Sequence, residues 1–435
     1  MGQSALDRWL LRRMGRPPGS AMPSGDELRD WQLARLRELV AHARDSCPFY
    51  AQQFEGVDTD FKSLEEYARL PFVFPFQVRQ APERMLCVSQ DAVARVVTLN
   101  SSGTTGSPKR IFNTAEDLEA TTEFFDYGMV NLVQEGQTVF VLMPGDRPGG
   151  VGRLLAEALG RRNIRVVSHG VLENADEAAR HCLLEKAHCV VGSPAHVNLF
   201  AHAWRRSGFP TGVVRSALLC WDAIPQAAVG NVSRLLGCRV FRHWGMIETG
   251  LGGAVECEPC SGLHLRESDV FVEIVDPVTE RPVRDGELGE IVVSTPLRRG
   301  MPFIRYRTGD TGRILPGACV CGSPLRRLDP VISRAAGSID LGSGWLSLRV
   351  LNECLYSVPG LGDFAASHAN KTLTVAVCGD RPGLEGEVRA ALESLAVVKH
   401  AFRRGTLNLE IELRDAATPA VAGLGKRRIE HTLEN

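Results

Sequence analysis

Hydrophobic and polar residues follow one another along this chain in a pattern that predicts alternating helices and strands. Near the N-terminus, apolar side chains recur at helical spacing over 31–40 (WQLARLRELV), which predicts an amphipathic helix. Further along, helical segments are separated by short apolar runs typical of buried strands. Strands that alternate with helices indicate parallel βαβ units with helices covering the sheet. The predicted strands lie at 138–143, 164–167, 189–191, 216–220 and 239–241.

The pattern changes after Gly252. Several short strands lie between 262 and 313, separated by Asp-Pro, Asp-Gly and Gly-Glu turns, as in an antiparallel sheet or small barrel. The small, glycine-rich stretch 333–344 (SRAAGSIDLGSG) is typical of a hinge. Beyond it, two strand-like runs flank a helical segment at 384–395.

These patterns predict an α/β fold in two domains. A large N-terminal domain, 1–332, would contain βαβ-type sheets with helices plus a small antiparallel β region. The hinge 333–344 would join it to a small, mobile α+β C-terminal domain, 345–435. The length of 435 residues supports this division, because so long a chain exceeds a single compact core.

Composition and charge exclude several classes of protein. Hydrophobic residues make up 44% and charged residues 23%, as in ordinary globular proteins. The net charge of −1 gives no overall field to attract nucleic acid or anionic lipid. The N-terminus lacks a signal peptide's apolar segment, and no apolar run approaches the roughly 18 residues of a membrane span. We therefore expect a cytoplasmic protein with no nucleic-acid or membrane partner.

The segment 100–109 (NSSGTTGSPK) carries the strongest chemical signal. Seven of its ten residues are Ser, Thr or Gly, so backbone N–H groups and hydroxyls are available to phosphate oxygens, with Lys109 as a nearby cation. It follows an apolar, strand-like run at 94–99. The spacing differs from that of a Walker A loop. A flexible polar turn is the alternative interpretation, and the loop alone does not decide between the two.

Four segments in fixed order resemble the adenylate-forming enzymes, most closely the phenylacetate–coenzyme A ligase family. They are SSGTTGSPK at 101–109, HWGMIET at 243–249, RYRTGD at 305–310 and GKRRI at 425–429. The similarity extends over nearly the whole chain, from about Trp31 to Ile429. Any one of these motifs is weak, but four in order are specific.

The resemblance implies a two-step reaction. A carboxylate attacks the α-phosphate of ATP, giving an acyl-adenylate and pyrophosphate, and the thiol of coenzyme A then displaces AMP. Glu248 would hold Mg²⁺, Lys109 would lie by the phosphates, and Lys426 would bridge carboxylate and phosphate. Each has an ordinary alternative as a solvated side chain. The residues implied for nucleotide binding are Ser101, Ser102, Gly103, Thr104, Thr105, Gly106, Asp222, Trp244, Gly245, Asp310 and Arg334.

Some positions depart from the family pattern. Ile247 stands where a Ser or Thr usually precedes the metal-binding glutamate, and 335–337 (AAG) replace the acidic residues usual after the hinge arginine. These departures keep open the alternative of a nucleotide-binding protein that has lost catalysis. Transfer to an amine or a carrier-protein thiol also stays open, because the sequence does not reveal the surfaces that choose the acceptor. The sequence does not identify the acid, because 143–150 (MPGDRPGG) is less aromatic than a phenylacetate pocket should be. Relatives suggest a homodimer.

Four of the twelve cysteines form two close pairs. Cys257 and Cys260 form a C-x-x-C motif, and Cys319 and Cys321 form C-x-C. Two such pairs from separate segments are the usual components of a tetrahedral structural zinc site, and His264 is a substitute ligand. Similar relatives carry cysteine or histidine at corresponding places. The alternative is four reduced thiols near turns.

Overall fold

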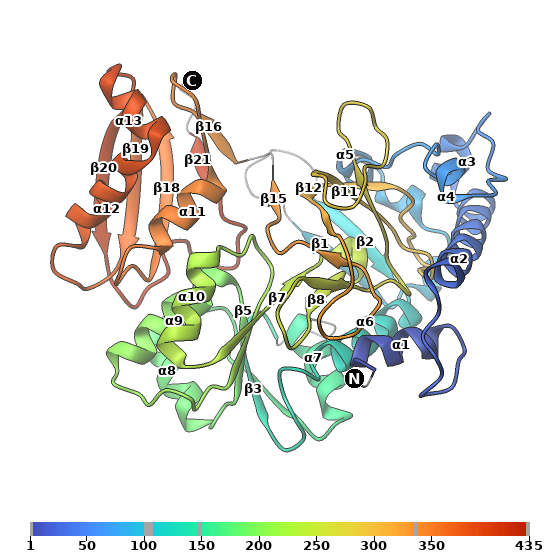
Figure 1. Cartoon of the computed structure of the whole chain (residues 1–435), viewed down its shortest axis with the longest axis horizontal. Coiled ribbons are helices and arrows are strands. Elements are labelled where there is room, and N and C mark those ends of the chain that lie inside the picture. Colours follow the sequence, from blue (N-terminus) through green and yellow to red (C-terminus); the bar gives the residue numbers. More distant parts are fainter. Residues whose placement is uncertain (1–2, 100–107, 146–149, 335–336, 432–435) are drawn as a thin grey trace. The chain divides into compact units, whose positions relative to one another are not determined.

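The computed structural model describes residues 3–99, 108–145, 150–334 and 337–431. The chain divides into two compact units, each made from two separate stretches. Unit 1 comprises Met1–Asn131 with His243–Ile332, and unit 2 comprises Leu132–Arg242 with Ser333–Asn435. Within the described ranges, every helix is too short or too polar to cross a lipid bilayer. Figure 1 labels the elements in chain order.

Unit 1 opens with helices. The helix predicted around 31–40 is confirmed as part of α2, which begins after a capping box between Ser24 and Glu27. Leu36, Leu39 and Val40 lie on its buried face and join the hydrophobic core of this unit. The helices of unit 1 are α1 (Ala5–Arg13), α2 (Gly25–Ser46), α3 (Pro48–Gln53), α4 (Leu64–Tyr67), α5 (Pro75–Gln80) and α6 (Ala115–Gly128), with 3-10 helices η1 (Pro82–Met85), η2 (Gln90–Ala92) and η3 (Ile247–Thr249).

The strands of unit 1 are antiparallel, which confirms the change of pattern after Gly252. β10, β11 and β12 pair in that order, and β13, β14, β9 and β8 form a second ladder that ends on the last two residues of β7. A hairpin of β1 and β2 completes the unit. The bounds are β1 (Arg95–Leu99), β2 (Lys109–Asn113), β8 (Ala254–Glu256), β9 (Leu263–Leu265), β10 (Phe271–Val275), β11 (Gly289–Ser294), β12 (Tyr306–Gly312), β13 (Ile314–Leu315) and β14 (Arg327–Leu328).

Unit 2 contains the predicted parallel sheet. Its strands pair in the order β7, β6, β5, β3 and β4, all parallel. In Figure 1, α8, α9 and α10 lie side by side along these strands. The elements are β3 (Thr138–Leu142), α7 (Val151–Gly160), β4 (Arg165–Ser168), α8 (Ala175–Leu184), β5 (Cys189–Gly192), α9 (Pro194–Arg206), β6 (Ser216–Leu219), α10 (Gln226–Leu236) and β7 (Arg239–Trp244).

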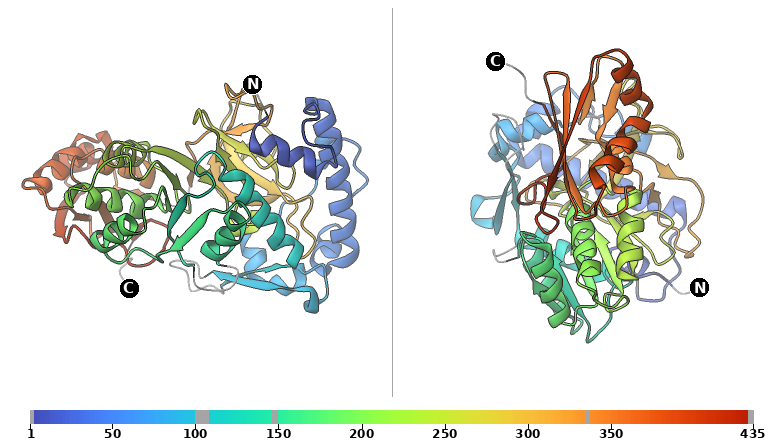
Figure 2. Two further views of the ribbon diagram at one scale, coloured as in Figure 1. Left: turned by 90° about the horizontal axis from the view of Figure 1, so that it is seen from below. Right: turned by 90° about the vertical axis from the view of Figure 1, so that its left-hand side faces the viewer.

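The later part of unit 2 forms a four-stranded sheet in the order β20, β19, β18 and β21. α12 and α13 cover one face of it (Figure 2) and bury Val388, Leu392 and Val398 in a core with Val375. The predicted α/β fold class is thus confirmed. The bounds are β15 (Ser333–Arg334), β16 (Ser338–Asp340), β17 (Trp345–Ser347), α11 (Leu348–Tyr356), β18 (Asp363–Ala369), β19 (Thr372–Cys378), α12 (Leu384–Ser394), α13 (Ala396–Arg403), β20 (Asn408–Arg414) and β21 (Ile429–His431).

Candidate functional site

Three side chains from distant parts of the sequence meet in unit 1. Lys109 begins β2, Glu248 lies in η3, and Tyr306 begins β12. The hydroxyl of Tyr306 donates to Oε1 of Glu248 at 2.8 Å, and Nζ of Lys109 lies 2.8 Å from the same hydroxyl. Lys109 also forms an ion pair with Oε1 of Glu248. Lys109, predicted to lie by the phosphates, and Glu248, predicted to hold the metal, are therefore in direct contact.

The electrostatics of this cluster keep Glu248 ionised. Its side chain is 4% exposed, and burial alone would raise its pKa. The ammonium group of Lys109 and the hydrogen bonds from Lys109 and Tyr306 outweigh that effect, so the pKa lies below its usual value. Nζ of Lys109 also lies 5.4 Å from the ring centroid of Tyr306, within the range of a cation–π contact. A buried, ionised carboxylate with fixed orientation results.

Trp244 and Asp310 form a second contact in unit 1. The indole Nε1–H of Trp244 donates to Oδ2 of Asp310 at 3.0 Å, and both residues are buried. The backbone beside the indole is crowded: a Cβ on Gly253 would lie 2.6 Å from the ring of Trp244, and one on Gly245 would lie 2.9 Å from Cα of Gly252. Only glycine fits at these two positions, so Gly245 serves the packing of this segment.

The phosphate loop falls at the end of a described hairpin. β1 and β2 pair antiparallel as far as Leu99 opposite Lys109, which confirms the strand predicted before the loop. The predicted binding residues Ser101, Ser102, Gly103, Thr104, Thr105 and Gly106 lie outside the described residues.

The other predicted site residues belong to unit 2. Asp222 is half-buried and lies shortly after β6, and Lys426 is half-buried shortly before β21. Arg334 is exposed at the end of β15. The roles that the resemblance implies for these three residues remain predictions.

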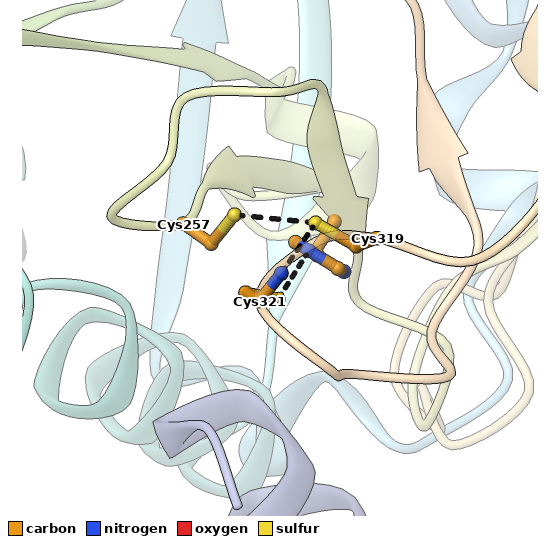
Figure 3. Close-up of side chains that lie close together, drawn as sticks. Cys257, Cys319 and Cys321 are labelled. Atoms are coloured by element: carbon orange, nitrogen blue, oxygen red, sulfur yellow. Dashed lines mark hydrogen bonds between the residues drawn. The ribbon is translucent and has the colours of Figure 1, made fainter. Parts of the chain in front are cut away.

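A cluster of potential metal ligands lies in unit 1. One ligand atom from each of Cys257, His264, Cys319 and Cys321 lies within 4.8 Å of the others. Sγ of Cys257 lies 3.6 Å from Sγ of Cys319, and Sγ of Cys321 lies 3.4 Å from Nε2 of His264. Figure 3 shows the three cysteines converging. Zinc–sulfur bonds of about 2.3 Å in a tetrahedron separate two sulfurs by about 3.8 Å, so the donor set and its spacing fit zinc.

Pairing of β9 with both β8 and β14 gathers this cluster. Cys257 follows β8, His264 lies in β9, and the loop from β13 to β14 carries Cys319 and Cys321. Hydrogen bonds involving Ser261, the N–H of Cys321 and other neighbours outweigh burial and lower the pKa of Cys319 to about 6. A thiol with so low a pKa readily becomes the thiolate that binds metal.

Cys260 is the one predicted ligand that lies outside the cluster. Its backbone has φ of 53°, and its Sγ lies 3.6 Å from the carbonyl oxygen of Glu258. His264, predicted only as a substitute ligand, lies with the other three residues instead. The C-x-x-C spacing did not reveal this difference, because the local backbone turn directs the second thiol elsewhere.

Tyr306 was not assigned a role from the sequence. It lies inside the RYRTGD motif, but only the folded geometry brings its hydroxyl to Glu248, 58 positions away in the sequence. A buried tyrosine in a motif is ordinarily a packing residue, and Tyr306 is 1% exposed.

Comparison with known proteins adds independent information. The family model described as AMP-binding enzyme matches residues 35–300. The phenylacetate–coenzyme A ligase of Thermus thermophilus is 31% identical over 323 residues, which cover 71% of each chain. The enzyme of the same name from Pseudomonas putida is 30% identical over 331 residues, 72% of each chain.

Solved structures share the fold at lower identity. A 2-hydroxyisobutyryl-CoA ligase in its postadenylation state superposes with a TM-score of 0.78 at 18% identity, covering 95% of this chain and 93% of that one. An amide bond synthetase from Marinactinospora thermotolerans has a TM-score of 0.53 at 15% identity, covering 98% of both. Three findings agree: the sequence motifs, the match to the family model, and the similarity to the two phenylacetate–coenzyme A ligases. The chain belongs to the family of AMP-binding, adenylate-forming enzymes and resembles, within it, the phenylacetate–coenzyme A ligases.

Proposed function

We propose that this protein is an ATP-dependent, AMP-forming acyl–coenzyme A ligase. The observation that carries the proposal is the buried Glu248 carboxylate, ionised beside Lys109, in a chain related to phenylacetate–coenzyme A ligases. In the first step, the substrate carboxylate attacks the α-phosphate of ATP and pyrophosphate leaves. In the second step, the thiol of coenzyme A attacks the acyl carbon of the adenylate and AMP leaves.

The roles of the residues follow from the charges they carry. The hydroxyls and N–H groups of 101–106, with Lys109, neutralise charge on the phosphates. Asp310 binds the ribose hydroxyls through its carboxylate, Arg334 is assigned to the ribose as well, and Trp244 packs against adenine. Lys426 bridges the substrate carboxylate and the phosphate during adenylation. Preorganised charge of this kind accounts for much of the rate of phosphoryl and nucleotidyl transfer.

Glu248 is the residue that we propose holds Mg²⁺. Carboxylate oxygens are the ligands that Mg²⁺ prefers, and an ionised glutamate fits that need. When bound, the ion offsets negative charge on the phosphate oxygens. Tyr306 fixes the orientation of the carboxylate through its 2.8 Å hydrogen bond.

We also propose a structural zinc ion held by Cys257, His264, Cys319 and Cys321. The spacing of their ligand atoms supports this assignment. Four protein ligands complete a tetrahedron, so the ion would serve the fold and not the reaction. We further propose a cytoplasmic location, since none of the twelve cysteines, all within the described residues, forms a disulfide, as is usual in a reducing compartment.

The substrate acid and the acceptor are the open parts of the proposal. The names of the relatives suggest phenylacetate and 2-hydroxyisobutyrate as the first acids to test. Ile247, which replaces the usual hydroxyl residue beside Glu248, favours one alternative, a protein that binds nucleotide without catalysis. A second alternative is an enzyme that transfers the acyl group to an amine or a carrier-protein thiol, because the acceptor is not identified by the sequence.

The test is pyrophosphate release with Mg-ATP across aryl and short-chain acids, with and without coenzyme A. Release that depends on one acid, with a coenzyme A thioester formed when the thiol is added, is the expected result. Acid-dependent release without thioester formation would favour another acceptor. ATP binding without release on any acid would overturn the enzyme assignment.

A further inference from the structure

The backbone that follows Lys426 is firmly anchored within unit 2. The side chain of Arg427 is 8% exposed and forms an ion pair with Asp363, itself 1% exposed. It also donates to the carbonyl oxygen of Phe364, and its guanidinium carbon lies 4.3 Å from the centroid of that ring. Although burial opposes the charge, the carboxylate of Asp363 raises the pKa of Arg427 above its ordinary value. The Arg427 side chain is therefore a permanent, buried cation.

Asp363 ties this anchor to the rest of its sheet. Its Oδ1 accepts a hydrogen bond from the hydroxyl of Tyr356 at 3.1 Å, and its Oδ2 accepts one from the N–H of Ala420 at 2.9 Å. Directly after the anchor, Ile429 pairs with Ala366 in parallel β21 and β18. The loop that carries Lys426 is thus held at both of its ends.

A second contact holds this loop from outside its sheet. Oδ2 of Asp222 accepts a hydrogen bond from the backbone N–H of Arg427 at 2.7 Å, and Oδ1 accepts one from the N–H of Ala223 at 2.8 Å. Both carboxylate oxygens of Asp222 therefore bind backbone donors. Trp221, just before it, has φ of 80°, a left-handed conformation that is unusual for an aromatic residue.

We propose that Asp222 and Arg427 are positioning residues for Lys426 in the adenylation half-reaction. This inference rests on the proposed function. Consecutive Cα atoms lie about 3.8 Å apart, so fixing the backbone at Arg427 fixes the start of the Lys426 side chain. The resemblance to the family implies a nucleotide-binding role for Asp222, whereas the hydrogen bonds place its carboxylate on the loop that carries Lys426. Thioester formation does not use Lys426 in the proposed scheme. The hydrogen bond between Asp222 and Arg427 should therefore affect adenylation only.

The test compares the two half-reactions in Asp222→Ala. Acid-dependent pyrophosphate release should fall by roughly 10- to 100-fold, since small displacements of a catalytic group have effects of that size. Thioester formation from supplied acyl-adenylate and coenzyme A should be unchanged, and so should the KM for ATP. Asp222→Asn keeps only one acceptor oxygen and should give an intermediate rate. Asp276→Ala is the matched control, because Asp276 also accepts two backbone N–H bonds, but in a turn of unit 1.

Several results would overturn the inference. An equal loss in both half-reactions would make Asp222 merely structural, and a raised KM for ATP at unchanged kcat would make it a nucleotide contact. Unchanged pyrophosphate release would remove it from the mechanism.

Hydrogen–deuterium exchange supplies a readout that does not depend on activity. The N–H of Arg427 should exchange slowly in the wild-type protein and quickly in Asp222→Ala, while the amides of 429–431 stay protected. Fast exchange at Arg427 in the wild type would refute the contact. If the wild type releases no pyrophosphate with any acid, the proposed function fails, and the exchange result still decides whether Asp222 holds the loop.

Discussion

Among the groups that keep Glu248 ionised, Lys109 has the largest effect, and this dependence can be tested by pH. In the wild type its pKa lies below the ordinary 4.5, so its stabilising contribution is present above that pH and is lost as pH falls through the lowered pKa. In Lys109→Met, burial should instead raise the pKa. The variant would then gain stability relative to the wild type as pH falls from 7 towards 5. Thermal unfolding at several pH values measures the difference.

The exposed Lys62 offers a control for this experiment. Lys62→Met removes the same charge from unit 1 and leaves Glu248 unaffected. The stability of this variant relative to the wild type should therefore stay constant between pH 7 and pH 5. A pH-independent difference for Lys109→Met as well would contradict the assigned electrostatics.

Tyr306 gives a second prediction for a single residue. Tyr306→Phe removes the hydrogen bond that the hydroxyl donates to Glu248 and the one that it accepts from Lys109, so adenylation should slow roughly tenfold and the Mg²⁺ concentration for half-maximal rate should rise. Tyr67→Phe is the control, because it removes another buried hydroxyl of unit 1, the one hydrogen-bonded to Ser294. The two variants should lower the melting temperature by similar amounts. A rate equal to that of the wild type would show that the Glu248 carboxylate does not need this bond.

At the scale of elements, the cysteine–histidine cluster should hold β8, β9 and the loop between β13 and β14 together. The purified protein should contain one zinc per chain, and chelation should lower the melting temperature by about 5 °C or more. Cys319→Ser should lose the metal, whereas Cys260→Ser should keep it. A metal content of zero in untreated protein, or loss of zinc in Cys260→Ser, would overturn the proposed ligand set.

The same elements indicate what sequence patterns can predict. The parallel strands were correctly located because five apolar runs that alternate with helical segments are compatible with few folds other than a parallel sheet. The helix predicted at 384–395 is α12, which differs by one residue at its end. The two-pair cysteine motif named three of the four residues whose ligand atoms gather, and it included Cys260 in place of His264. A single left-handed residue redirects the thiol of Cys260 without changing the spacing.

At the scale of the whole molecule, Lys426 should be needed for adenylation and not for thioester formation. Lys426→Ala should slow adenylation by about 100- to 1,000-fold, the usual loss when one charge-stabilising group is removed. Thioester formation from supplied acyl-adenylate should persist. Arg428→Ala, two residues along and exposed, is the control. Unchanged pyrophosphate release in Lys426→Ala would exclude this lysine from the reaction.

Each unit is built from two stretches of chain, and this limits what a sequence can show about a site. Motifs identified Lys109, Glu248, Asp222 and Lys426 one at a time. The contact between Asp222 and Arg427 spans 205 positions, and no local pattern encodes it. Motifs therefore predicted candidate residues for the chemistry, while the side chains and backbone groups that contact them emerged only from the fold.

The left-handed backbone at Trp221 has a consequence for protein engineering. A bulky residue in such a conformation costs about 1–3 kcal/mol, and glycine would remove most of that strain. Trp221→Gly would relieve this strain but would also remove a half-buried side chain, so the melting temperature of the variant measures one effect against the other. The same change would loosen the turn that presents Asp222 to the lysine loop, so adenylation should slow whichever way the melting temperature moves.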